Sequence, residues 1–152
     1  MAATPSQLLF GDDHADAIRA LESVDAGKGW CNVVPCVVDD VPDIKINFSG
    51  LWVKHGTAQA SFVTALPRQG EPQPSSLGIL HLRGRLGRDR IATLLGSAPF
   101  TLRQDHSQRG LLFSVPANAP ASQVLDIMCT FTTSLCTYEM TGNWRLDLFL
   151  RR

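Results

Sequence analysis

Arginine and glycine are concentrated in one short stretch of the chain, HLRGRLGRDR at residues 81–90. Guanidinium groups bind phosphate and carboxylate through charged hydrogen bonds, so this composition indicates an anion site. The stretch contains neither G-x-G-x-x-G nor G-x-x-x-x-G-K-[ST], the two glycine-rich phosphate-binding patterns. Asp89 falls in the first turn of the helix expected next, where its carboxylate would repel a phosphate. We therefore expect Gly87 to allow a tight turn and not to form a phosphate loop.

Side chains alternate between the two faces of a strand, and this alternation sorts the basic residues. In the expected strands 77–86, 100–105 and 144–150, leucines fall on one face and basic residues on the other. If the leucine faces all meet helices, the opposite face of the sheet is predominantly basic. The candidate ligand- or partner-binding residues on that face are His81, Arg83, Arg85, Arg103 and Arg145.

Three interpretations of this basic face are open at the level of sequence. The arginines can cover a solvated face and pair with Asp105 and Asp147 on neighbouring strands. The face can instead contact a partner protein. It can also be covered by a second copy or by the first half of the chain, where Asp39, Asp40 and Asp43 would supply the counter-charges. We favour the solvated, internally paired face, with the partner surface next.

The overall charge argues against a dedicated nucleic-acid-binding domain. Lys and Arg number 14, as do Asp and Glu, although residues 1–75 carry a net charge of −4 and residues 76–152 one of +4. Such domains usually have a basic excess, which this chain lacks. Residues 109–115, RGLLFSV, begin like the basic-glycine motif of RNA-recognition domains, but Leu111 stands where a stacking ring is expected. Binding of nucleic acid or a phosphorylated ligand is therefore the alternative function.

Cysteine and histidine offer the remaining candidate chemistry. The cysteines are Cys31, Cys36, Cys129 and Cys136, and the histidines are His14, His55, His81 and His106. Neither cysteine pair has the spacing of a compact zinc site, so we expect buried, reduced thiols and neither a metal nor a cofactor. The chain contains no H-E-x-x-H and no G-x-S-x-G. No enzyme class is favoured, and a small enzyme with a Cys or His site is a further alternative.

The elements that position these residues indicate an α+β fold. Helical periodicity is found at 12–27, 88–95 and 121–137. Strands are expected at 29–40, 43–56, 57–66, 77–86, 100–105, 111–115 and 144–150, with a loop at 67–76. The second and third of these strands should form a hairpin through the dipeptide His55-Gly56. The second half then has the order β-α-β-β-α-β of a ferredoxin-like unit, which predicts a mostly antiparallel sheet with helices on one face.

Length and composition predict a single domain over residues 1–152. No apolar run approaches the ~20 residues of a membrane span, and the first residues have no basic region typical of a signal peptide. We therefore expect a cytoplasmic protein that does not bind membranes. Trp30 and Trp52 are candidates for exposed side chains that anchor a partner.

The absence of catalytic motifs and the polar strand faces together predict a non-catalytic protein-binding or regulatory module. It would contact a protein partner, or a second copy of itself as a homodimer, through a sheet face or edge. The order of elements is also similar to that of small α/β chaperone-like folds, an analogy of topology alone.

Overall fold

The computed structural model describes residues 6–26, 28–38, 43–45, 52–54 and 57–151, with only the backbone described at 43–45 and 52–54. The helices are α1 (Ala15–Ala26), α2 (Arg88–Leu95) and α3 (Ala121–Leu135). The strands are β1 (Ser6–Phe10), β2 (Trp30–Val37), β3 (Asp43–Lys45), β4 (Trp52–Lys54), β5 (Gln59–Val63), β6 (Ser75–Leu80), β7 (Thr101–His106), β8 (Gly110–Val115) and β9 (Met140–Phe149). The chain is α+β, as expected from its sequence.

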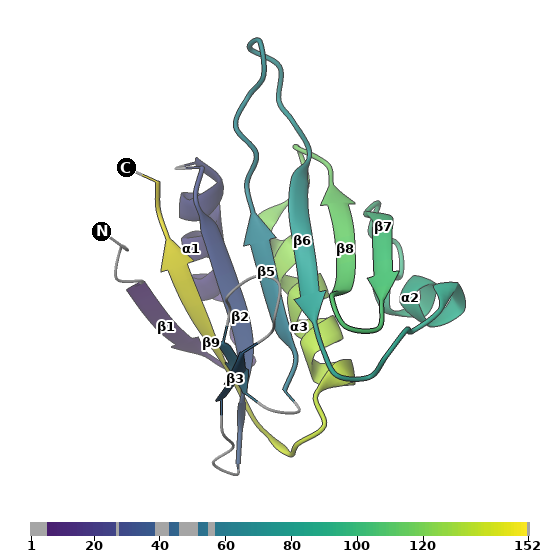
Figure 1. Cartoon of the computed structure of the whole chain (residues 1–152). Helices are drawn as coiled ribbons and strands as arrows, with labels where there is room; N and C mark the ends of the chain where they lie inside the picture. Colours follow the sequence, from purple (N-terminus) through teal and green to yellow (C-terminus); the bar gives the residue numbers. More distant parts are fainter. Residues whose placement is uncertain (1–5, 27, 39–42, 46–51, 55–56, 152) are drawn as a thin grey trace.

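Seven strands form one antiparallel sheet in the order β1-β9-β2-β5-β6-β8-β7, while β3 and β4 pair with each other. Figure 1 shows α1 and α3 behind this sheet and α2 beside its β7 end. The face towards α1 and α3 is called the helix face here, and the opposite one the open face. The expectation of an antiparallel sheet with helices on one face is confirmed for α1 and α3. No helix in the described part of the chain is long and apolar enough to span a membrane.

The ferredoxin-like sheet expected for the second half is wrong, although its elements follow each other in the expected order. In a ferredoxin-like unit the last strand pairs with the first. Here β9 pairs with β1 and β2, and both β2 and β5 lie between β9 and β6. Strands from the first half therefore occupy the edge of β6 that β9 would otherwise take.

The core lies between the helix face and the two helices on it. Every second residue of the central strands is buried there, as Cys31 and Val33 of β2 and Leu77 and Ile79 of β6 illustrate. Helix α3 begins after Pro120 and buries an apolar side of Val124, Leu125, Met128, Phe131 and Leu135. These five residues recur at helical spacing within the helix expected at 121–137, and such an apolar stripe marks the side that packs against the core.

Several expected boundaries differ from the structure. Strand β1 was not expected, and β6 ends at Leu80, six residues before the end of the expected strand 77–86. The expected hairpin of 43–56 with 57–66 is wrong, because β4 pairs with β3 whereas β5 pairs with β2 and β6. The proposed turn at 55–56, the residues Asp39 and Asp40, and the side chains of Asp43 and Trp52 lie outside what the structure describes.

Residues 64–74 connect β5 to β6 and are called the hairpin arm. Figure 1 shows the arm rising beyond one end of the sheet. Arg68 and Glu71 exchange backbone hydrogen bonds at its tip, across a turn in which Gln69 and Gly70 have φ of 53° and 78°. Two positive φ values suit a type I′ turn, which is compatible with the twist of a hairpin. The loop expected at 67–76 is therefore a loop closed at its tip by one isolated bridge between Arg68 and Glu71, and only its last two residues, Ser75 and Ser76, belong to β6.

Candidate functional site

The first three candidate residues do not lie on a strand face. Strand β6 ends at Leu80, and residues 81–87 form an irregular segment before α2. His81 continues the buried side of β6 and is only 3% exposed, whereas Leu82 is 45% exposed. This is the reverse of the assignment expected over 77–86, in which the leucines face the helices and His81 lies on the opposite face. That assignment used Leu82 and Leu86, which lie beyond the end of the strand.

Asp105 of β7 holds this segment in place. Its two carboxylate oxygens accept the backbone N–H groups of Leu86, at 3.1 Å, and of Gly87, at 2.9 Å. Gly87 has a φ of 86°, a backbone conformation that favours glycine. The backbone amides that would otherwise cradle a phosphate before α2 are therefore bonded to a carboxylate of the chain itself.

The buried imidazole of His81 is a neutral group with one free nitrogen. Its Nδ1 accepts the backbone N–H of Arg83 at 3.1 Å, so the proton of the neutral ring is on Nε2. Nε2 is buried and has no hydrogen-bond partner among the described residues. Burial lowers the pKa of His81, Asp105 partly offsets this by raising it, and Arg90 and Arg83 lower it further.

Exposed guanidinium groups surround this segment. We define the arginine corner as Arg83, Arg85, Arg88, Arg90 and Arg103, which lie on residues 81–87, on α2 and on the edge strand β7. Arg83 donates to the backbone oxygen of Cys136 at 3.4 Å. Within the described ranges, none of the five forms an ion pair with a carboxylate. The structure therefore brings four of the five predicted site residues together at one corner: His81, Arg83, Arg85 and Arg103.

The fifth predicted residue, Arg145, lies apart from the corner. It is on β9, and β2 and β5 separate that strand from β6, a distance of about 14 Å at the usual strand spacing. Its Nε donates to both carboxylate oxygens of Asp147, at 3.1 and 3.3 Å. This pairing compensates the charge of Arg145, so the open face as a whole is not the predominantly basic surface expected from the sequence.

An apolar row crosses one end of the open face. Phe149 of β9 pairs with Trp30 of β2, and Trp30 pairs with Val63 of β5. The rings of Trp30 and Phe149 are stacked, with centroids 5.1 Å apart and planes 6° from parallel. Trp30 is 36% exposed and Val63 is 39% exposed. We call Phe149, Trp30 and Val63 the apolar row.

A polar band adjoins the apolar row. Asp147, Asn32 and Ser61 pair in register across β9, β2 and β5, and the Ser61 hydroxyl donates to Asn32 Oδ1 at 2.7 Å. Asn32 and Ser61 are thus bonded to each other, while Asp147 is only 8% exposed and is paired with Arg145. Trp30 was expected as a possible anchor, but the row was not, because the residues that pair across strands cannot be read from the sequence of one strand.

The cysteines are poorly suited to nucleophilic chemistry. Burial raises the pKa of Cys31 and of Cys129 to about 12, so both thiols are protonated at neutral pH. Cys136 is buried too, while Cys36 is half-buried and has a pKa raised by burial, an effect partly offset by Arg145. The described residues contain no group of three or more His, Cys, Asp or Glu side chains that could hold a metal ion.

Comparison of the chain with protein-family models, with curated proteins and with solved structures finds no match.

Proposed function

We propose that this chain is a non-catalytic protein-binding module whose partner contacts the open face of the sheet. The observation that carries the proposal is the apolar row, in which Trp30 and Val63 are exposed and Phe149 is half-buried. It lies on the one sheet face that α1 and α3 do not cover (Figure 1).

Further properties of the open face support this proposal. Leu9 of β1 and Leu112 of β8 also belong to it, with exposures of 70% and 38%. Stacked aromatic rings provide a rigid apolar surface, and tryptophan is among the side chains that contribute most to binding energy in interfaces. In the adjacent polar band Asn32 and Ser61 are neutral and half-buried, and the charge of Asp147 is compensated by Arg145. A partner with an apolar surface flanked by neutral polar groups is therefore the expected ligand.

The proposal is tested by capturing partners from cells that express the chain, using the wild-type chain and the variant Trp30→Ala/Val63→Lys. The control variant is Leu66→Lys, which introduces the same charge at a leucine of the hairpin arm that is 55% exposed. We expect a protein that the wild type and the control retain and that the open-face variant loses. Identical partner profiles for all three proteins, each confirmed as folded by circular dichroism, would contradict the proposal.

A second candidate function is anion binding at the arginine corner. It is favoured by exposed guanidinium groups that have no carboxylate partner within the described ranges. Residues 81–95 and strand β7 contain no Phe, Trp or Tyr, and Phe100, which precedes β7, is only 6% exposed. Backbone phosphates are thus more plausible contacts than stacked bases. Binding of a fluorescent oligonucleotide should weaken steeply with salt and be lost in Arg85→Glu/Arg88→Glu, whereas no binding at low salt eliminates this function.

A further inference from the structure

Two adjoining cavities lie where the hairpin arm leaves the sheet. One, of about 160 Å³, lies between α1 and the start of α3, and the other, of about 240 Å³, lies under the arm. Both are lined by Asp25, Ser75 and Ala117, so they adjoin at these residues and are described together as one groove. We call it the arm groove. It is distinct from the apolar row, which lies on the other side of the sheet.

The inner part of the arm groove is apolar, and the residues that line it belong to the hydrophobic core. Leu21, Phe62 and Val124 line it and are at most 5% exposed. The wall opposite α1 runs from Pro116 into the first turn of α3 and contains no charged residue before Asp126. This part of the groove is therefore suited to an aliphatic side chain of a ligand.

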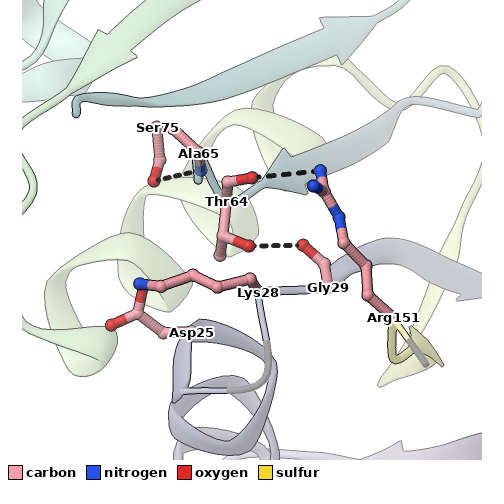
Figure 2. Close-up of polar contacts among 7 residues, drawn as sticks. All are labelled: Asp25, Lys28, Gly29, Thr64, Ala65, Ser75 and Arg151. Carbon is pink, nitrogen blue, oxygen red and sulfur yellow. Dashed lines mark hydrogen bonds and ion pairs between the residues drawn. The ribbon is translucent and has the colours of Figure 1, made fainter. Parts of the chain in front are cut away.

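The base of the hairpin arm is held by hydrogen bonds that Figure 2 shows together. The Thr64 hydroxyl donates to the Gly29 carbonyl at 2.7 Å, and the Ser75 hydroxyl oxygen accepts the N–H of Ala65 at 3.4 Å. Arg151 donates to the Thr64 carbonyl at 3.4 Å. Prolines at 67, 72 and 116 further restrict the walls. The groove is consequently preformed, and binding in it costs little ordering of the protein.

The charges of the groove are on the α1 side. Glu22 and Asp25 lie three residues apart on this helix, so their side chains are neighbours. Lys28 Nζ lies 3.9 Å from Asp25 Oδ1, a loose contact between partly exposed groups. Glu22 forms no ion pair within the described part of the chain. This arrangement leaves a net negative wall beside an apolar pocket.

We propose that the arm groove binds an extended peptide segment of a partner protein that carries an aliphatic residue beside a lysine or arginine. The aliphatic side chain fills the pocket formed by Leu21, Phe62 and Val124. The cationic side chain lies along α1, next to Glu22 and Asp25. Charge complementarity selects this occupant, because an acidic segment would be repelled by the same two carboxylates.

The experiment is an NMR titration of the ¹⁵N-labelled full chain with the blocked tripeptide acetyl-Leu-Ala-Arg-amide. Acetyl-Leu-Ala-Glu-amide and acetyl-Ser-Ala-Arg-amide are the matched probes that lack the positive charge and the aliphatic side chain. We expect amide shifts at residues 21–26 and 116–124. The affinity for acetyl-Leu-Ala-Arg-amide should be on the order of fivefold above that for acetyl-Leu-Ala-Glu-amide. The variant Glu22→Gln/Asp25→Asn should remove this difference.

Ala117→Trp tests the location, because this exposed residue lines both cavities and a larger side chain fills them. Its control is Ala92→Trp on the exposed side of α2. We expect only Ala117→Trp to lose peptide binding, and Trp30→Ala to keep it, which separates this site from the open face. Equal affinity for the arginine and glutamate peptides, shifts located elsewhere, or unchanged binding by Ala117→Trp would overturn the proposal.

Discussion

His81 links the stability of the protein to pH at the scale of a single residue. Burial lowers the pKa of its imidazole in the folded state, so the unfolded chain, with a histidine pKa of about 6.5, binds the proton first. The contribution of neutral His81 to stability is therefore present above about pH 6.5 and is lost as the pH falls below this value. Protonation of Nδ1 also removes the lone pair that accepts the Arg83 N–H, so this hydrogen bond is lost.

We expect the free energy of unfolding, measured with urea, to fall between about pH 7.5 and about pH 5, and His81→Gln to show a smaller fall. His106→Gln is the matched control, because His106 Nδ1 also accepts backbone N–H groups, those of Gln108 and Arg109, but is less buried. This control should keep the wild-type pH dependence. Parallel pH profiles for wild type and His81→Gln would contradict the assignment.

Thiol accessibility distinguishes Cys36 from the other three cysteines. Cys31, Cys129 and Cys136 are buried, whereas Cys36 is half-buried near the end of β2. We expect a thiol reagent to modify Cys36 alone in the folded protein, and faster at higher pH because burial raises the pKa of this thiol. Cys36→Ser should abolish the reaction. Labelling of Cys31 in the native state would contradict this prediction and would support the alternative of a small enzyme with a cysteine site.

At the scale of elements, Gly110 determines how closely β8 approaches β6. It has a φ of 77°, and a Cβ at this position would overlap the carbonyl oxygen of Ile79. We expect Gly110→Ala to lower the free energy of unfolding by roughly 3 kcal/mol, from backbone strain together with the displaced strand. Gly84→Ala is the control, because its φ is 73° but its surroundings are open. It should lose only about 1 kcal/mol in the same urea titration, and equal losses would refute the steric argument.

Elements with a strong periodicity were predictable from the sequence. Helix α2 was predicted at its observed bounds and α3 to within two residues, since the spacing of apolar side chains alone defines an amphipathic helix. Strand β1 was missed because five residues, SQLLF, contain no clear alternation. Strand β6 was extended too far because Leu82 and Leu86 continue a two-residue alternation after the backbone has left the sheet. Because the end of this strand was predicted wrongly, the sheet face assigned to Arg83 and Arg85 was wrong too.

At the scale of the whole molecule, the sheet order depends on pairings between distant parts of the sequence. Strand β9 pairs with β1 and β2, which precede it by more than a hundred residues. No local pattern specifies such partners, whereas the β-α-β-β-α-β order of the second half does follow from local patterns. The same long-range pairing creates the apolar row, since Phe149 and Trp30 belong to opposite ends of the chain. The opposite net charges of the two halves also lie at different places in the fold. The arginine corner of the second half is beside β7, and the acidic wall of the arm groove, from the first half, is on α1.

The two edges of the seven-stranded sheet differ in how they are protected from pairing with another chain. Edge strand β7 contains Arg103 and Asp105 and has an irregular register between Leu102 and Gln104, features that discourage pairing. Edge strand β1 has no charged residue, no proline and no irregularity along its register with β9. Its Leu9 is 70% exposed. The unprotected edge predicts that copies of the chain associate through β1 at high concentration.

Sedimentation equilibrium of the full chain over a wide concentration range measures this association. Leu9→Lys places a charge on the β1 edge and should weaken self-association, because charged side chains oppose edge-to-edge pairing. The matched control is Thr101→Lys, at an exposed position on β7. It should associate as the wild type does, since the proposed contact involves only β1. A wild type that stays monomeric throughout, or equal weakening by both substitutions, would show that the β1 edge is not the surface through which copies meet.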